Sequence, residues 1–409
     1  ALFRQAWQMV MQRHSVLRSA VVWKGLSRPL QALLRQTPCD WQELDWREST
    51  QTAAELHWEQ FVADDRKRLF ELDRPPLMRW TLIAMPDGLW RLLWTHTHIL
   101  LDGWSVALIV KDVLQLYDGL LANSLPELPP AMQYRDYIAW LAGRELSEAQ
   151  RFWRDTLQDA APGALMPELT GQQGYLDAFE HLAEADCQPL RQLARQLGLT
   201  LNTLVQAAWA LVLAERSGVD EVLFGVTVSG RSNELDGIET ITGLFINTLP
   251  LYLALDRDMA LADWLKAIQA RQFAMQQYEY ASLADIKKWS GATLAFDSIV
   301  IYENYPVDKA LLGAERPLRL SAVKAYEHTH YPLTLLAIPD DGLALQMTYN
   351  AALFQADTVQ ACLRQLAAHL RAMPAQAGHG LLADFFRPAA SSVSTADFLQ
   401  ATMALDEDF

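Results

Sequence analysis

The chain has 409 residues, 51% of them hydrophobic and 20% charged, which suffices for one large domain or two packed ones. The net charge is −15, and the sequence shows neither a basic patch with interleaved aromatics nor an apolar run of about 20 residues, so nucleic-acid and membrane partners are disfavoured. Cys39, Cys187 and Cys362 lie far apart, which argues against a disulfide framework or zinc site and fits buried thiols in a cytoplasmic protein. We expect a monomeric domain.

In the first half, apolar spacing and turn residues predict alternating helices and strands. Helices are expected at residues 2–18, 51–70, 104–117 and 147–157. Strands are expected at residues 19–23, 78–85 and 90–100. The chain begins inside the first helix, so its start reads as truncated. A loose stretch at residues 160–174 predicts the boundary between an N-terminal subdomain, residues 1–165, and a C-terminal one, residues 166–387.

The second half also shows alternating helix and strand patterns. Thr200 is expected to cap a helix through Glu215 whose apolar stripe packs in the core. Further helices are expected at residues 263–278 and 358–373, and strands at 222–228, 298–302, 332–338 and 343–349. The alternation in both halves suggests two similarly built α/β layers. The tail, residues 388–409, is acidic and apolar after a serine-rich lead, and it reads either as a docking segment or as a linker.

The most informative stretch runs from His96 to Ser105. A strand is expected to end near Leu101, with His96 and His98 on one face of it. Asp102 and the glycine after it then mark a turn before a helix. A histidine next to the free N–H groups of a helix start can serve as a base beside a developing negative charge.

Two simpler interpretations stay open on these residues alone. His98 could be a histidine of the core whose hydrogen bonds are satisfied there, and Asp102 could be a turn former or a helix N-cap. No nucleophile elbow, dinucleotide-binding glycine turn or phosphate-binding loop is present. The other histidines show no metal-ligand spacing, although His328 and His330 could be two ligands on a strand face or part of an ordinary strand.

Five segments, in order, resemble motifs of the condensation domains of nonribosomal peptide synthetases. They are Arg13–Arg18 ("RHxxLR"), Thr97–Gly103 ("HHxxxDG"), Tyr134–Trp140 ("YxDYxxW"), Ser229–Pro250 ("SGR … GxFxNTLP") and Phe296–Pro306 with its "ENYP" end. The resemblance runs from about residue 2 to residue 375. Each motif alone is weak, but five in the right order are strong evidence.

The resemblance implies an α/β fold of two chloramphenicol acetyltransferase-like subdomains, set in a V as a pseudo-dimer with a central tunnel. It implies an acyltransferase that moves an acyl or peptidyl thioester, held on the phosphopantetheine of a donor carrier protein, to the amine or hydroxyl of an acceptor, usually on a second carrier. No cofactor or metal bound by the chain itself is expected. Carrier proteins are often acidic too, so docking would need local basic patches on this chain.

The resemblance also assigns residues to the site. His98 would take a proton from the nucleophile or hold it in line, and the Gly103 N–H is the candidate oxyanion donor. Structural support is expected from Asp102, Arg231 and Thr97. Residues expected to line the tunnel are His96, Trp104, Asn247, Ser298 and Tyr331. Ser105 and Trp104 are otherwise expected to serve packing and capping.

One residue departs from the motif, because Thr97 stands where the family has its first histidine. Two alternatives to condensation stay open. One is a related epimerization domain, against which the "NTLP" and "ENYP" segments argue. The other, which Thr97 and the missing start suggest, is a silent docking module that binds carrier proteins without chemistry.

Overall fold

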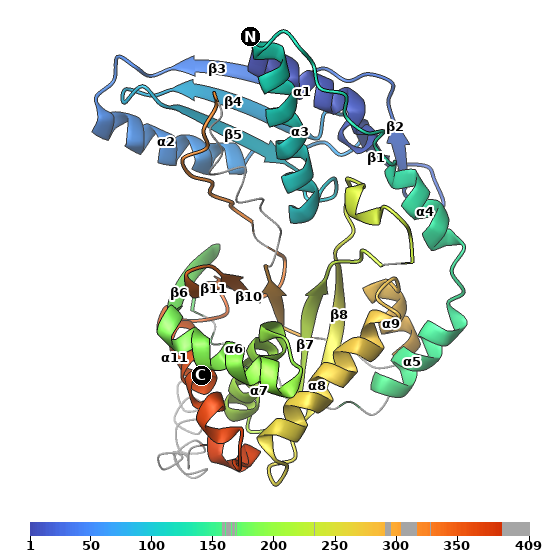
Figure 1. Ribbon diagram of the computed structural model, residues 1–409, viewed down its shortest axis with the longest axis vertical. Coiled ribbons are helices and arrows are strands. Elements are labelled where there is room, and N and C mark those ends of the chain that lie inside the picture. Colours follow the sequence, from blue (N-terminus) through green and yellow to red (C-terminus); the bar gives the residue numbers. More distant parts are fainter. Residues whose placement is uncertain are drawn as a thin grey trace, which may run out of the picture. The chain divides into compact units, whose positions relative to one another are not determined.

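The computed structural model describes residues 1–386 apart from 158–159, 161–164, 166–167, 169, 233, 291–295, 304–316 and 328. The chain forms two compact units, whose positions relative to one another are not determined (Figure 1). Unit 1 comprises residues 1–145, 229–246 and 305–325, and unit 2 comprises residues 146–228, 247–304 and 326–409.

These units differ from the continuous subdomains expected with a boundary at residue 165. Unit 1 ends near residue 145, and two later segments of the chain return to it. The segment Ser229–Ile246, here called the crossover segment, connects two strands of unit 2 yet makes its contacts in unit 1. A loop rich in turn residues marks a break in the chain, but it does not show with which unit a later segment packs. The expected tail, residues 388–409, lies outside the described residues.

Unit 1 holds a three-stranded sheet and a separate hairpin. Its elements are α1 (Leu2–Arg13), the 3₁₀ turn η1 (Ser15–Arg18), β1 (Ser19–Val22), β2 (Leu30–Leu33), β3 (Trp41–Asp45), α2 (Gln51–Arg66), β4 (Met78–Ala84), β5 (Trp90–His96), α3 (Gly103–Leu121), α4 (Tyr134–Ala142) and η2 (Ile238–Thr240). The sheet order is β3-β4-β5, with β3 parallel and β5 antiparallel to β4, while β1 and β2 pair antiparallel with each other.

Alternating residues of β4 explain why the three-stranded sheet is covered on both faces. Trp80 faces α1, where its ring centroid lies 5.1 Å from that of Trp7. The next residue back, Arg79, points the other way and makes a buried ion pair with Asp65 of α2, with Nε 2.6 Å from Oδ1. Thr95 of β5 donates a 2.6 Å hydrogen bond to the same carboxylate. This ion pair fixes α2 to the sheet.

Arg79→Met should lower the free energy of unfolding of unit 1 by about 3–5 kcal/mol, because the buried Asp65 would keep only the exposed Arg68 at 3.5 Å as a cationic partner. Urea unfolding followed by tryptophan fluorescence measures the loss. The matched control is Arg47→Met, which removes an exposed ion pair with Asp45 and should leave the unfolding curve unchanged. Equal stability of the Arg79 and Arg47 variants would contradict the importance of the buried pair.

Unit 2 is built on a six-stranded sheet of order β6-β11-β10-β9-β7-β8 (Figure 1). Its elements are α5 (Ser147–Leu157), β6 (Tyr175–Ala183), α6 (Glu184–Leu197), α7 (Leu201–Ser217), β7 (Glu221–Val228), β8 (Asn247–Ala254), α8 (Leu261–Gln276), α9 (Leu283–Ser290), β9 (Ser298–Tyr302), β10 (Leu333–Pro339), β11 (Gly342–Asn350), α11 (Ala356–Gln376) and η3 (Leu382–Phe385). β9 runs parallel to both β7 and β10, and the other pairs are antiparallel.

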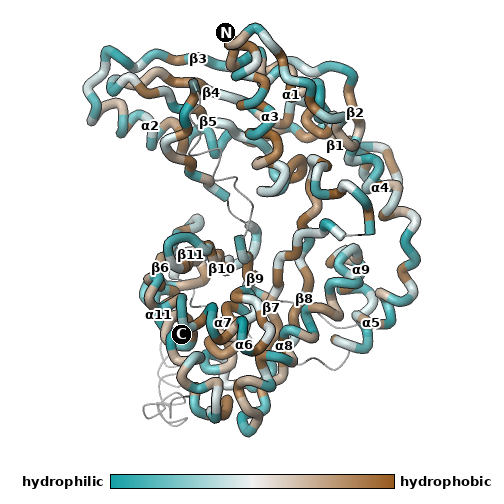
Figure 2. Tube along the Cα trace, in the orientation of Figure 1, coloured by the Kyte–Doolittle hydropathy of each residue, from teal (hydrophilic) through white to brown (hydrophobic). Residues whose placement is uncertain are grey.

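Helix α7 is the centre of the unit 2 core. Every residue from Thr203 to Ala214 is buried, as expected for a helix that is apolar on all sides. Its Thr200 cap, which accepts a hydrogen bond from the Thr203 N–H, was predicted from the sequence and is confirmed. Hydrophobic and hydrophilic residues are interspersed along the other elements of both units, as expected where one side of an element is buried (Figure 2).

Among the described residues, no single helix has the length and apolar character to cross a membrane. Helices α6 and α7 meet the criteria of length and composition only as a pair, across a 106° bend.

Candidate active site

The histidine motif of unit 1 lies in a loop between β5 and α3. The prediction that the strand continues to residue 100 is wrong, because β5 ends at His96, opposite Met78. The neighbouring strand cannot be extended, since Pro75 and Pro76 lack N–H groups for pairing. His98 therefore lies on a turn and not on the strand face of His96.

Buried leucines hold this loop in place. Thr97 donates its N–H to the Leu77 carbonyl over 3.1 Å, and the Leu100 N–H donates to the Thr97 carbonyl over 3.1 Å. Leu100 and Leu101 are buried in the unit 1 core, whereas His98 is exposed. The loop thus presents an accessible imidazole on a well-anchored backbone.

His96 belongs to an aromatic cluster at the end of β5. Its ring centroid lies 4.9 Å from that of Trp94, which in turn lies 4.8 Å from Trp7 of α1. The His96 Nδ1 is 3.4 Å from the Thr97 carbonyl oxygen. Its expected place along a substrate tunnel stays a prediction.

Asp102 caps α3 and is bound on several sides. Its Oδ1 accepts the Ser105 N–H over 2.8 Å, and its Oδ2 accepts the Phe245 N–H over 3.1 Å. The Arg231 Nη2 lies 3.2 and 3.3 Å from the two carboxylate oxygens. The Asp102 N–H donates to the Gly243 carbonyl over 3.2 Å. With no side-chain exposure, this carboxylate meets the requirement that a buried charge be paired and hydrogen-bonded.

Arg231 joins the helix start to the crossover segment. Its Nη1 donates to the carbonyls of Ile238 and Ile241 over 2.7 and 2.9 Å. Its guanidinium carbon lies 3.9 Å from the centroid of the Phe245 ring, and 5% of its side chain is exposed. Burial lowers the pKa of Arg231, an effect that the charge of Asp102 opposes. The structure thus places Arg231 against Asp102, where the sequence expected a cationic partner.

Ser105 does more than pack and cap the helix, because its hydroxyl also binds the crossover segment. It is fully buried, and its hydroxyl donates to the Gly243 carbonyl over 2.8 Å. The same oxygen accepts the Gly243 N–H over 3.0 Å and the Arg231 Nη2 over 2.9 Å. A hydroxyl has one donor and two acceptor positions, so all of them are used. Ser105 therefore fastens the first turn of α3 to the crossover segment.

Two more motif segments hold the crossover segment from other sides. The Tyr134 hydroxyl of α4 donates to the Leu244 carbonyl over 2.5 Å, and its ring leaves no room for a side chain at Gly243. His14, which follows α1, has Nδ1 3.0 Å from the Thr242 hydroxyl. Its Nε2 lies 2.8 Å from Asp112 of α3. Residues from four of the five motifs therefore meet around one loop of unit 1.

Gly103 is the first residue of α3. No described residue accepts its N–H, as is usual for the first amides of a helix. The positive end of the helix dipole adds to the attraction for negative charge there. The neighbouring Trp104 donates its indole N–H to the Glu239 carbonyl over 2.9 Å, which again ties the helix start to the crossover segment.

The three expected tunnel residues of unit 2 all make hydrogen bonds or ring contacts within that unit. Asn247 donates to the carbonyls of Glu279 and Ala281 over 2.8 and 2.7 Å, so it holds the turn after α8. Ser298 is buried and accepts the Trp209 indole N–H over 3.1 Å. Tyr331 stacks on Phe296 with ring centroids 5.5 Å apart. These contacts give Asn247 and Ser298 structural duties, and their contact with substrate stays a prediction.

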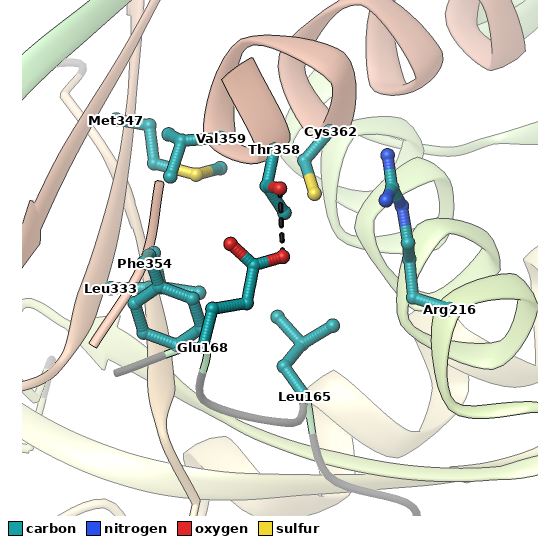
Figure 3. Close-up of a pocket in the computed structure, with 9 residues that line it drawn as sticks. All are labelled: Leu165, Glu168, Arg216, Leu333, Met347, Phe354, Thr358, Val359 and Cys362. Atoms are coloured by element: carbon teal, nitrogen blue, oxygen red, sulfur yellow. Dashed lines mark hydrogen bonds between the residues drawn. The ribbon is translucent and has the colours of Figure 1, made fainter. Parts of the chain in front are cut away.

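A cavity of about 160 Å³ lies in unit 2, with Glu168 and Cys362 in its wall. Figure 3 shows Glu168 directed at Thr358, whose hydroxyl donates a 2.8 Å hydrogen bond to the Glu168 carboxylate. Its other oxygen accepts the Gln355 N–H over 3.2 Å, so this carboxylate caps α11. Burial raises the pKa of the Cys362 thiol in the same wall, which disfavours its thiolate form.

Among the described residues, no group of three or more His, Cys, Asp or Glu side chains could hold a metal ion. His328, one of the two histidines considered from the sequence, lies outside the described residues.

Comparison with known proteins gives the same family along nearly the whole chain. A family model described as Condensation domain matches residues 1–381. A linear gramicidin synthase polypeptide of Brevibacillus parabrevis is 40% identical over 395 residues, 93% of this chain and 8% of that protein. Chondramide synthase of Chondromyces crocatus is 42% identical over 345 residues, 82% of this chain and 9% of that protein. The chain thus spans less than a tenth of the length of these relatives.

Solved structures support the fold. The X-domain from teicoplanin biosynthesis has a TM-score of 0.78 at 20% identity, over 92% of this chain and 88% of that chain. The first condensation domain of the calcium-dependent antibiotic synthetase, in complex with a substrate analogue, has a TM-score of 0.74 at 18% identity, over 94% of this chain and 89% of that chain. The mixed α/β fold expected from the sequence is confirmed.

Proposed function

Since the chain belongs to the condensation-domain family, we propose that it transfers an acyl or peptidyl group from a carrier-bound thioester to the amine, or the hydroxyl, of an acceptor. The observation that carries this proposal is the exposed His98 on a loop anchored by Asp102, in the same short segment as the first N–H of α3. Both groups come from one rigid segment, so their spacing is preorganised.

The reaction needs a nucleophile, a proton acceptor and a place for negative charge. The acceptor nitrogen attacks the thioester carbonyl carbon, and His98 takes the nitrogen's proton or holds the nitrogen in line. The carbonyl oxygen becomes an oxyanion, which the Gly103 N–H and the helix dipole stabilise. The C–S bond then breaks, the amide forms, and the departing sulfur takes up the proton. Asp102 and Arg231 act by positioning the loop.

The partners follow from this chemistry. The donor is carried on the phosphopantetheine of one carrier protein, and the acceptor usually sits on a second. Phosphopantetheine is thus part of the substrate, and the reaction requires no cofactor bound by the chain itself.

Intact-protein mass spectrometry tests the function. A carrier loaded with an aminoacyl thioester is mixed with a second loaded carrier, with and without the chain. Condensation moves the donor mass onto the acceptor carrier. Epimerization leaves every mass unchanged but alters the stereochemistry of the donor, which chiral chromatography after hydrolysis detects. Absence of transfer across a varied substrate panel would refute the acyltransferase.

A silent docking module is the second candidate, and two observations favour it. Thr97 replaces the first motif histidine, and the teicoplanin X-domain, which has the same fold, was solved in a complex with OxyB. This candidate expects carrier binding without any transfer of mass.

Thr97→His separates the two candidates. Residue 97 is half-buried at the end of β5, while His98 is the exposed residue, so the wild type should already be active. The substitution should then change kcat/KM by less than about threefold. An inactive wild type whose Thr97→His variant transfers the donor would instead establish a silenced condensation domain.

A further inference from the structure

The β1–β2 hairpin of unit 1 exposes large apolar side chains. Trp23, Leu26, Leu30 and Leu33 are 40, 44, 47 and 48% exposed. Leu30 and Leu33 belong to β2, whereas Trp23 and Leu26 lie in the turn between the two strands. Among the described strands β2 pairs only with β1, so its outer edge is open. A cluster of exposed apolar residues beside an open strand edge is typical of an interaction surface.

The hairpin is also basic, on an acidic chain. From residue 15 to residue 39 the sequence holds no Asp or Glu, although the whole chain has a net charge of −15. The four cations of this stretch are Arg18, Lys24, Arg28 and Arg35. The basic hairpin, defined as residues 18–35, is therefore a local positive patch of the kind that an acidic partner requires.

Most of these positive charges are uncompensated. The Arg18 guanidinium donates to the carbonyls of Met11, Gln12 and Leu34, which satisfy its N–H groups without neutralising its charge. Arg28 and Arg35 are exposed and have no ion-pair partner among the described residues. Lys24 alone pairs with a carboxylate, that of Asp73 at 3.0 Å.

We propose that the basic hairpin is a docking surface for an acidic carrier domain. The proposal rests on the proposed function, which makes carrier proteins the partners of this chain. Two acidic proteins repel over long range, but at 0.1 M salt charges farther apart than about 10 Å are screened. Close contact is then governed by local charge, and Arg28 and Arg35 face the partner's carboxylates. Trp23 and Leu33 bury apolar surface against the carrier, which adds affinity that salt does not remove.

The test combines Arg28→Glu with Arg35→Glu and measures the dissociation constants of loaded donor and acceptor carriers by fluorescence anisotropy. The double variant should bind at least one carrier about tenfold more weakly at low salt, with the difference shrinking at 0.5 M salt. Transfer from a diffusible acyl-pantetheine thioester to a free amine should match the wild type, because neither arginine belongs to the site. Trp23→Ser should weaken binding at both salt concentrations.

The matched control is Lys287→Glu with Lys288→Glu on α9, which makes the same change in net charge at exposed positions. Binding of both carriers within twofold of wild type in the arginine variant would overturn the docking surface, as would an equal loss in the lysine control. Failure of the wild type to transfer any acyl group would refute the proposed function instead. If the wild type and the arginine variant condense equally well, with equal KM for both carriers, the docking role of the hairpin is refuted and the proposed function is not.

Discussion

His98→Ala should lower kcat/KM for transfer between two carriers by about 10² to 10⁴-fold, the range expected when a positioned acid–base group is removed. The free energy of unfolding should stay within about 0.5 kcal/mol of wild type, because His98 is exposed. Leu100, Leu101 and Asp102 would still anchor the loop backbone. Mass spectrometry of the carriers gives the rate, and urea unfolding gives the stability.

The matched control for this variant is His57→Ala, which removes an exposed histidine from α2. Its turnover should equal that of wild type. If His98 acts by proton transfer, His98→Gln should be about as slow as His98→Ala, since glutamine can hold the nucleophile but cannot accept its proton. Turnover of His98→Ala within threefold of wild type would remove His98 from the mechanism.

Much of the secondary structure could be predicted from local pattern. The expected strand at residues 298–302 and the helix capped by Thr200 agree with β9 and α7, because each is apolar and ends at clear signals. The expected strand at residues 90–100 is too long by four residues. Its end is set by Pro75 and Pro76, which lie just before the neighbouring strand β4 and outside residues 90–100.

Strands with unusual residues or positions were missed. β8 contains Pro250, which reads as a strand breaker, but β8 is the last strand of its sheet and an edge strand tolerates proline. β6 lies at the opposite edge, and most of its residues are exposed, so the sequence shows no apolar run there. β2 is a short exposed strand of the basic hairpin. Edge strands carry weak hydrophobic signals because only part of their surface is buried.

The site could be predicted in part. The motifs identified His98, Asp102 and Arg231 from the sequence. In the structure Asp102 and Arg231 are in contact, although 129 positions separate them in the sequence. The link between Ser105 and Gly243 spans 138 positions and involves backbone groups, which carry no residue-specific signal. The sequence therefore identified the side chains of the ion pair but not the backbone contacts that make the helix start rigid.

The second prediction with a large expected effect concerns the rigid start of α3. Asp102→Ala should lower the free energy of unfolding of unit 1 by about 3–5 kcal/mol, because Arg231 would stay buried without its carboxylate. The N–H groups of Ser105 and Phe245 would also lose their acceptor. Arg231→Met leaves Asp102 with both N–H donors, so its cost should be smaller. Urea unfolding, with hydrogen exchange of α3 amides as a local probe, measures each loss.

A double-mutant cycle decides whether the pair acts as a unit. In the Asp102→Ala and Arg231→Met combination neither charge is left buried alone, so the double variant should be more stable than the sum of the single losses predicts, by about 1–3 kcal/mol. Additive losses would show that the two residues stabilise unit 1 independently. If Asp102 positions the loop, kcat should fall in Asp102→Ala even at temperatures where the variant is fully folded, whereas binding of the carriers to the basic hairpin should persist. Loss of both kcat and carrier binding would show instead that the whole of unit 1 depends on this carboxylate.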